Sequence, residues 1–534
     1  MKSHFSLPAP TLLLRAVVLS AFVLLTLLGS PKCMVPAAAW LGPALLVWFV
    51  RHHPLKQVLL WGIPALWVSG AVGMYGLVPL PDAAFAGFVA VAAPLGLLPY
   101  LLDRWLAPRL RGFAATLALP CTMVAWEYLQ SFGNTGVWPS VANSQFGFNS
   151  LVQLASVTGL WGISFVVYWF AATSNWALAA PAAQRTRGLL TYGGVLAAVL
   201  LFGALRTAPA LRSGPPTVRV AGITVDNLRC LEAMYADWFG KEVHLPADAS
   251  QSSPALQEAQ RAFGPFIAQP HHARFRTTHG VFTQLHDSLF ALSGREARGG
   301  ARIILWSEAN AFVLKENEAG LVRRGAAFAA AHRVYLLMAL AVILPGEVTA
   351  ERKFLENKTV LVGPDGRVLN TYLKNIPVPG VEPAVPGDGA IPAIPTPYGT
   401  LSPAICYDAD FPQLLRQTGR QGTDLLLLPA GDWKAITPFH SYVAVFRAVE
   451  NGFSVVRQVN HGESLAADAY GNLLASASFF GAADKTLVAY VPTRRVPTVY
   501  NLIGDAFAYA CILALTGFVM YARLYRRKPA LVVG

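Results

Sequence analysis

The sequence predicts a two-part membrane protein, in which a bundle of about eight transmembrane helices accompanies a layered α/β domain. Of its 534 residues, 54% are hydrophobic and 13% are charged, whereas soluble domains usually carry about 25% charged residues. The charges are sparse before residue 210 and denser from about 215 to 460. Apolar runs dominate the first part, and short strand and helix patterns alternate in the second.

Eight apolar runs are close to the length that a transmembrane helix needs. They cover, approximately, residues 11–29, 34–50, 57–79, 83–102, 112–130, 151–178, 188–206 and 502–522. The first run could be a signal peptide because Lys2 precedes it, but no small-residue cleavage site follows Gly29 and more spans come later, which favours a retained helix. The expected division is a seven-helix bundle over 1–210, an α/β domain over 215–495, and a last helix with a basic tail over 500–534.

The loops between the runs carry an asymmetric charge that predicts the topology. With the N-terminus in the cytoplasm, the second, fourth and sixth loops and the C-terminal tail lie inside. The Lys and Arg residues of these segments are Arg51 and Lys56; Arg104, Arg109 and Arg111; Arg185 and Arg187; and Arg523, Arg526, Arg527 and Lys528. Of the outside loops, 80–82 and 131–150 carry neither residue, and the first carries only Lys32. Because cytoplasmic loops are enriched in Lys and Arg, segment 207–500 is expected outside the cytoplasm.

One carboxylate, Glu127, falls inside the fifth apolar run. An ionisable side chain is costly in lipid. Glu127 therefore either reaches water at the interface or lines a path toward the outer domain, and the sequence leaves both interpretations open.

The segment 217–495 mixes strands, helices and hairpins. Expected strands cover residues 218–223, 301–306, 333–343, 359–362, 368–372, 401–406, 425–428, 455–459 and 466–468. Expected helices cover 254–294, with breaks near Gly264 and Gln269, then 317–332 and 412–421. This mixture indicates a layered α/β domain. The pattern is weakest over 226–300, and this region is a candidate to contain a flexible lid.

Three chemically reactive residues lie at or just after the ends of predicted strands: Glu308, Lys374 and Cys406. Strand ends meet at one edge of a sheet, where sites in open α/β folds form. A carboxylate can remove the thiol proton, and an ammonium favours both the thiolate and a tetrahedral oxyanion. Each residue alone also has an ordinary structural interpretation, as a packed thiol, a solvated strand end or a surface charge. Together they form a set sufficient for acyl transfer.

The sequence lacks the patterns that are typical of several other function classes. The net charge is +13, but the cations form short clusters between apolar runs rather than a stripe with aromatic residues, which argues against nucleic-acid binding. Five cysteines are present without CxxC spacing, and the histidines lack paired ligand spacing, so no metal site is expected. No phosphate-binding glycine loop appears, so no cofactor is expected.

Several short motifs occur in an order that resembles one family across both parts of the chain. They are Gly136-Val137-Trp138-Pro139, Gly159-Leu160-Trp161-Gly162, Trp306-Ser307-Glu308, Tyr372-Leu373-Lys374, Ile405-Cys406-Tyr407-Asp408 and Gly431-Asp432-Trp433. This order is similar to that of the apolipoprotein N-acyltransferases, a membrane branch of the nitrilase (carbon–nitrogen hydrolase) superfamily. Eight spans, with the nitrilase-like domain before the last, is also the family layout.

The resemblance implies a nitrilase-like αββα sandwich and a two-step acyl transfer in the bacterial inner membrane, with the catalytic domain on the periplasmic side. Cys406 would take an acyl chain from a phospholipid and pass it to the N-terminal amine of a diacylglyceryl-cysteine lipoprotein. Glu308 would be the general base and Lys374 the oxyanion partner. The supporting residues would be Glu382, which orients Lys374 or assists proton transfer, and Tyr407 and Asp408, which shape the pocket.

The sequence departs from the family near the expected pocket. Ser307 stands where the family usually has proline, and Asp408 stands where it usually has glutamate. These differences leave open an alternative function, a membrane-tethered amidase or a divergent acyltransferase that acts on another amine.

Overall fold

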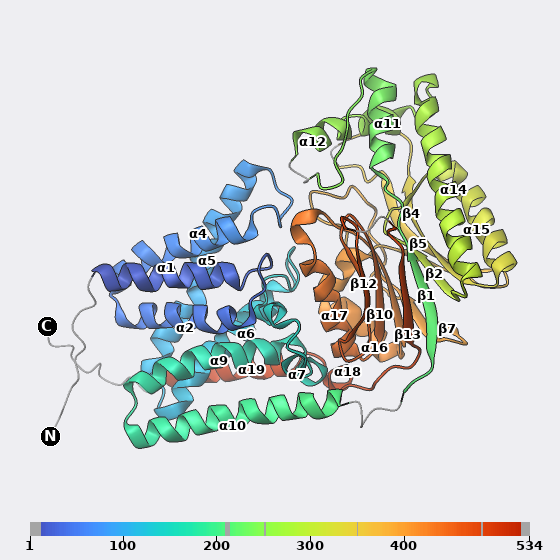
Figure 1. Cartoon of the computed structure of the whole chain (residues 1–534). Coiled ribbons are helices and arrows are strands. Elements are labelled where there is room, and N and C mark those ends of the chain that lie inside the picture. The colour runs from blue at the N-terminus through green and yellow to red at the C-terminus, as the bar shows by residue number, and fades with distance from the viewer. Residues whose placement is uncertain (1–11, 209–213, 250–252, 350, 482–483, 525–534) are drawn as a thin grey trace, which may run out of the picture. The chain divides into compact units, whose positions relative to one another are not determined.

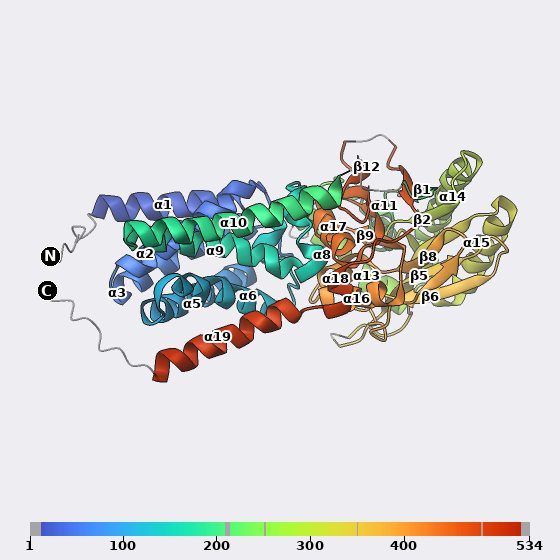
Figure 2. The same ribbon diagram turned by 90° about the horizontal axis from the view of Figure 1, so that it is seen from below.

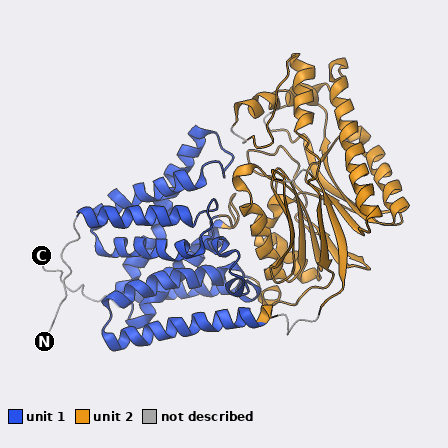
Figure 3. Ribbon diagram, in the orientation of Figure 1, with its two compact units in different colours: residues 1–130, 139–205, 505–534 blue, residues 131–138, 206–504 orange. Residues whose placement is uncertain are grey.

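The computed structural model describes residues 12–208, 214–249, 253–349, 351–481 and 484–524, which form two compact units (Figures 1 and 3). The first unit comprises the described residues within 1–130, 139–205 and 505–534, and the second those within 131–138 and 206–504. Lys2 and the basic residues Arg526, Arg527 and Lys528 lie outside the described residues.

Each of the eight predicted apolar runs contains a helix. The main helices of the first unit are α1 (Leu12–Leu28), α2 (Pro36–His52), α4 (Ile63–Met74), α5 (Asp82–Leu106), α6 (Ala118–Gln130), α9 (Leu160–Ala179), α10 (Ala182–Thr207) and α19 (Ala506–Leu524). Within the described chain, four helical segments are long and apolar enough to cross a membrane: Leu55–Met74, Asp82–Arg109, Ala182–Thr207 and Ala506–Leu524. The expected helical membrane part is therefore confirmed.

The interior of the first unit is built mainly from α2, α6 and α9. Phe49 of α2, Leu119 of α6 and Ala171 of α9 are fully buried in one hydrophobic cluster, and α1, α2 and α9 run along one another in both views (Figures 1 and 2). The outer helices instead expose apolar side chains, such as Leu190 at 69% and Leu513 at 72%. Such exposed leucines are expected where a helix faces lipid.

Glu127 of α6 is buried within the first unit, with 5% of its surface exposed. Its carboxylate accepts hydrogen bonds from Ser140 Oγ at 2.7 Å, Ser164 Oγ at 2.6 Å and the Val141 N–H at 3.1 Å. The interpretation in which Glu127 reaches water is therefore wrong. These donors, together with a hydrogen bond from the Tyr168 side chain, compensate its burial instead.

The second unit contains two stacked β-sheets. Among its described residues, the first sheet has the strand order β13 (Leu487–Pro492), β1 (Thr217–Ile223), β2 (Ile303–Trp306), β4 (Tyr335–Ile343), β5 (Leu355–Val362), β6 (Val368–Leu373), with β3 (Ala311–Leu314) paired to β4. The second sheet has the order β12 (Leu473–Ser478), β11 (Glu463–Ala467), β10 (Ser454–Asn460), β9 (Leu425–Gly431), β8 (Gly399–Pro403), β7 (Ile394–Thr396).

Helices cover the outer faces of both sheets (Figure 1). The first sheet packs against α11 (Leu228–Phe239), α12 (Pro254–Gln260), α13 (Phe263–Ala268), α14 (Arg276–Arg298) and α15 (Glu318–His332). The second packs against α17 (Phe439–Asn451), with α16 (Pro412–Gln421) beside it and α18 (Val499–Ile503) following β13. The αββα sandwich implied by the family resemblance is confirmed.

Side-chain alternation along the strands separates two cores. On β2, Ile303 and Leu305 enter the core between the sheets, whereas Ile304 and Trp306 enter the core under the helices. This alternation follows from the two-residue period of a strand, and burial on both faces explains why β2 is apolar throughout. Residues 226–300 contribute buried side chains such as Met234 and Phe275 to the helix-covered core, so much of this region is a structural layer of the domain.

Candidate active site

The three predicted reactive residues converge, although they come from two sheets and not from the edge of one. Glu308 lies two residues after β2 and Lys374 directly after β6, both in the first sheet. Cys406 lies three residues after β8 of the second sheet. The site therefore forms where the carboxyl ends of strands from both stacked sheets meet.

Cys406 begins a short helical turn, η8 (Cys406–Asp410), and has a positive φ of 47°. This left-handed conformation is uncommon for a residue with a side chain, and such residues cluster at functional sites. The residue is 3% exposed, and its Sγ lies 3.6 Å from the Gly431 carbonyl oxygen. The thiol is thus fixed by a tight strand-to-helix turn and shielded from bulk water.

Glu308 and Lys374 form the centre of a buried chain of charges. Lys374 Nζ donates to Glu308 Oε1 at 2.8 Å and to Glu382 Oε1 at 2.6 Å. Asn357 Nδ2 donates to Glu308 Oε1 at 2.7 Å, and the Gly431 N–H donates to Glu308 Oε2 at 2.7 Å. The carbonyl oxygen of Gly431 also lies beside the thiol, so this one residue contacts both the carboxylate of Glu308 and the sulfur of Cys406.

The electrostatics keep the lysine charged and the thiol neutral at rest. Burial disfavours the ammonium of Lys374, but attraction from Glu308 and Glu382 outweighs it and raises the lysine pKa well above its usual value. Burial, followed by repulsion from Glu308, raises the pKa of the Cys406 thiol well above its usual value. Burial also raises the pKa of Glu382. A thiol of this kind needs a base at the moment of attack, and the carboxylate of Glu308 is near enough to act on the thiol electrostatically.

Asp408 and Tyr407 support the turn that carries Cys406. Asp408 Oδ2 accepts from the Tyr372 hydroxyl at 2.7 Å and the Ile405 N–H at 3.0 Å, and its Oδ1 accepts from the Ile376 N–H at 2.9 Å. Through these bonds the carboxylate holds the backbone just before Cys406 and the backbone just after Lys374. Tyr407 is 6% exposed and packs edge-on against Phe411.

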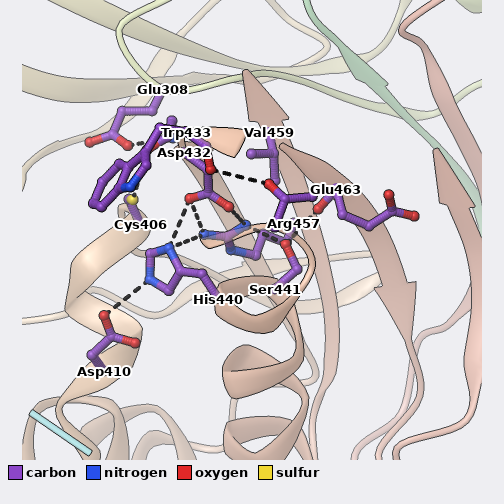
Figure 4. A network of polar contacts seen from close by, with 12 residues as sticks. Glu308, Cys406, Asp410, Asp432, Trp433, His440, Ser441, Arg457, Val459 and Glu463 are labelled. Atoms are coloured by element: carbon purple, nitrogen blue, oxygen red, sulfur yellow. Dashed lines mark hydrogen bonds and ion pairs between the residues drawn. The ribbon is translucent and has the colours of Figure 1, made fainter. Parts of the chain in front are cut away.

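A second buried network lies on the other side of the thiol (Figure 4). His440 of α17 has Nδ1 2.8 Å from Asp432 Oδ1 and Nε2 3.0 Å from Asp410 Oδ2. Arg457 of β10 donates to both oxygens of Asp432 at 2.9 Å. The cations hold the pKa of the Asp432 carboxyl well below its usual value despite burial.

The side chains of Cys406, Asp432 and His440 place one potential metal-ligating atom each within 4.8 Å of one another. A metal ion fits this group poorly. Both oxygens of Asp432 already accept from Arg457, and the same guanidinium reaches His440 Nδ1 at 2.9 Å. The network of hydrogen bonds therefore accounts for these residues without an ion.

The sequence contained signals for this second network that strand-end reasoning did not use. Arg457 lies in the middle of the fully buried strand β10, and a charge there requires a partner. Asp432 directly follows β9. The other reactive residues were identified because they, too, lie at or just after the end of a strand. No local pattern marks Asn357 or His440 as their partners.

Each of the two parts of the chain matches a known protein family. Residues 20–173 match the model of the apolipoprotein N-acyltransferase N-terminal domain, and residues 277–496 match the carbon–nitrogen hydrolase model. The chain is similar to the apolipoprotein N-acyltransferase of Geobacter metallireducens, with 25% identity over 94% of this chain and 93% of that protein. It is also similar to the apolipoprotein N-acyltransferase of Borreliella burgdorferi, with 23% identity over 80% of each chain. Among solved structures, an amidase from Nesterenkonia matches with a TM-score of 0.36 and 17% identity, covering 56% of this chain and 98% of that chain.

Proposed function

Because this chain is a member of the carbon–nitrogen hydrolase superfamily with the two-domain composition of the apolipoprotein N-acyltransferases, we propose that it N-acylates lipoproteins. The donor is a phospholipid, and the acceptor is the N-terminal amine of a diacylglyceryl-cysteine. The reaction proceeds through a thioester on Cys406.

In the first half-reaction, Cys406 Sγ attacks the carbonyl carbon of a phospholipid ester while Glu308 takes the thiol proton. The ammonium of Lys374 stabilises the oxyanion of the tetrahedral intermediate. The ester C–O bond then breaks, Glu308 returns the proton to the leaving oxygen, and a lysophospholipid departs. Glu382 keeps Lys374 oriented by the 2.6 Å hydrogen bond between them.

In the second half-reaction, the amine of the acceptor attacks the thioester carbonyl. Glu308 removes a proton from the attacking nitrogen, the C–S bond breaks, and the proton passes to the sulfur to regenerate the thiol. An amide is formed and no cofactor is consumed. Water must be kept from the thioester because hydrolysis would turn the transferase into a lipase, and the 3% exposure of Cys406 supports this requirement.

A cavity next to the nucleophile supports a long-chain acyl substrate. It has a volume of about 320 Å³ and lies within the second unit. Its apolar lining consists of Phe132, Ile376, Pro379, Tyr407, Phe411 and Leu414. Tyr407 lines this cavity and follows Cys406 directly in the sequence, which supports a route for an acyl chain from the cavity to the thiol.

The same proposal places the chain in the bacterial inner membrane, with the second unit on the periplasmic side. The four membrane-crossing helices support the membrane location. The concentration of Lys and Arg in alternate loops supports the orientation.

The convergence of Glu308, Lys374 and Cys406 carries the proposal, and the Cys406→Ala variant tests it. Purified wild type, incubated with phospholipid bearing a labelled acyl chain, should gain the mass of that chain on Cys406 and pass it to a diacylated lipopeptide. Cys406→Ala should do neither, and its loss should exceed about 10³-fold since the nucleophile is removed. Cys230→Ala, which alters a buried cysteine of the same unit, is the matched control and should remain active. Transfer by Cys406→Ala at the wild-type rate would refute the thioester mechanism.

The departures at Ser307 and Asp408 favour one second candidate, an amidase or acyltransferase acting on another amine. The mass of the adduct trapped on Cys406 after incubation with native lipids separates the two. A fatty acyl mass supports lipid donors, whereas a small water-soluble acyl group supports the second candidate.

A further inference from the structure

The two nitrogens of His440 connect two backbone segments that hold different parts of the site. Asp410, bonded to Nε2, is the last residue of the turn η8 that Cys406 begins. Asp432, bonded to Nδ1, directly follows Gly431, whose N–H holds Glu308 and whose carbonyl oxygen lies by the thiol. Figure 4 shows the ring between these two carboxylates, on the side of Cys406 away from Glu308.

The two carboxylates favour a doubly protonated ring. A carboxylate can only accept, so carboxylates at 2.8 and 3.0 Å from the two nitrogens favour an N–H on each, while Arg457 Nη2, which can only donate, also lies 2.9 Å from Nδ1. Asp410 depends on this ring, because its Oδ1 is buried with no hydrogen-bond partner among the residues that the structure describes. A neutral ring protonated on Nε2 alone would accept from Arg457 at Nδ1 and would lose its direct bond to Asp432.

The charged and titratable groups around the ring come from three other elements. Asp410 and Cys406 face it from η8, Asp432 from the end of β9, and Arg457 from β10. The uncharged ring of Trp138 packs against it at 5.2 Å. Burial and the repulsion of Arg457 oppose protonation, but Asp410 and Asp432 outweigh them, so the pKa of His440 is raised to about 9.

We propose that the imidazolium of His440 is a positioning residue, which holds the turn of Cys406 and the anchor of Glu308 at a fixed separation. The inference rests on the roles proposed above for Cys406 and Glu308. When His440 loses its proton, its direct bond to Asp432 is replaced by the longer link through Arg457, and the thiol moves relative to its base. A displacement of about 1 Å in such a geometry can lower a rate by about 10²-fold.

The experiment measures acylation of Cys406 by a p-nitrophenyl fatty-acyl ester, followed by intact-mass spectrometry between pH 6 and 10. This activated donor reports thioester formation even if the natural donor is not a phospholipid. The wild-type rate should fall on the alkaline side with a midpoint near pH 9. His440→Gln should lower the rate at pH 7 by about 10²-fold and remove that alkaline step.

Asp410→Asn provides the rescue arm. Its amide can donate to Nε2, so a neutral ring protonated on Nδ1 satisfies both neighbours, and the alkaline step should disappear while the rate at pH 7 stays within about 10-fold of wild type. This arm keeps the proposal testable if His440→Gln does not fold. The matched control is His286→Gln, which alters a partly buried histidine bonded to the Phe312 carbonyl and should leave the pH profile unchanged.

A step near pH 9 that persists in both Asp410→Asn and His440→Gln would overturn the positioning role. The proposed function fails separately: if the ester acylates Cys406 with the expected pH profile but no phospholipid does, the phospholipid donor is wrong and the role of His440 stands.

Discussion

At the scale of single residues, the site is defined by how buried polar atoms satisfy one another. Asp408 shows this clearly, because its carboxylate has three donors and no solvent contact. It is one methylene shorter than the glutamate usual in the resembling family, yet it reaches the backbone before the nucleophile and after Lys374. The shorter side chain therefore fits an anchoring role.

The Asp408→Asn substitution should weaken that anchor. An amide places a donor where a carboxylate oxygen accepted, so it faces at least one of the Ile405 and Ile376 N–H groups. A buried donor without an acceptor costs about 1–3 kcal/mol. The variant should unfold at a lower temperature in detergent and acylate Cys406 more slowly. An unchanged unfolding temperature would argue against the anchoring role.

His440 also predicts a pH dependence of stability. Its pKa rises from 6.5 to about 9 on folding, so the folded state holds a proton that the unfolded state releases. The resulting stability is fully present below pH 6.5 and is lost as pH rises through about 9. At about 1.4 kcal/mol per pH unit, the loss is on the order of 3 kcal/mol. Thermal unfolding of wild type and His440→Gln across this range should show a slope in the first that the second lacks.

The sequence could predict part of this site, and the separation of residues explains the rest. Glu308, Lys374 and Cys406 each follow an apolar strand, so local patterns mark them. His440 acquires its environment from Asp410, which is 30 residues away, and from a charge on another strand. A single histidine at the start of a helix carries no information about such partners.

At the scale of elements, the segment 131–138 is unusual, because it lies between helices of the first unit in sequence but packs within the second unit. The Val137 N–H donates to the Asp410 carbonyl oxygen at 3.0 Å, and Gln413 Nε2 donates to Ser131 Oγ at 2.8 Å. Trp138 packs against Phe439 and His440. This segment therefore braces the turn that carries the nucleophile.

Gly136→Ala should disturb this brace. Gly136 has φ of +51°, and a Cβ at this position would lie 2.5 Å from the Asp410 carbonyl oxygen. Both the conformation and the contact exclude a side chain, so the segment must move and the Val137 hydrogen bond must lengthen. We expect acylation of Cys406 to fall by about 10-fold or more, by displacement of the nucleophile turn. Gly112→Ala, at another left-handed glycine but with no atom within 4 Å of the Cβ, is the control for conformational strain alone. Equal effects of the two substitutions would contradict the bracing role.

Elements with strong local patterns could be predicted, whereas those stabilised by tertiary contacts could not. The helix expected over 412–421 coincides with α16, which begins at Pro412 and ends at a left-handed Gly422, both local signals. The strands β12 and β13 were not among the predicted strands. Strand β12 is exposed or partly buried along its whole length, β13 alternates buried residues with more exposed ones, and both are paired, with β11 and β1 respectively. Helix α17 was not predicted either; it is buried nearly throughout, and its polar side chains, such as His440 and Arg447, find their partners inside the folded domain and not in solvent.

At the scale of the whole molecule, two amino-acid patterns produce two kinds of unit. In the first unit, helices bury small and apolar residues inside and expose leucines outside, which is suited to lipid. In the second, alternating strands make two cores and leave polar strand ends to build the site. Composition and charge distribution suffice to predict this division. The site combines strand ends from two different sheets. That combination depends on how the sheets stack, which local sequence patterns do not predict.

The orientation of the chain in the membrane can be tested with cysteines. Cys33, in the loop between α1 and α2, is exposed, whereas Cys121, Cys230 and Cys511 are buried. In a Cys406→Ala background, the charge pattern predicts that Cys33 faces the periplasm, so an impermeant maleimide should label it in intact spheroplasts. A second protein carrying Cys33→Ser and Ala183→Cys, beside the arginines at the start of α10, should be labelled only after the membrane is permeabilised. The opposite pattern would place segment 207–500 in the cytoplasm. Lipoprotein acceptors on the periplasmic surface could then not reach Cys406, so this measurement tests the orientation independently of the chemistry at the thiol.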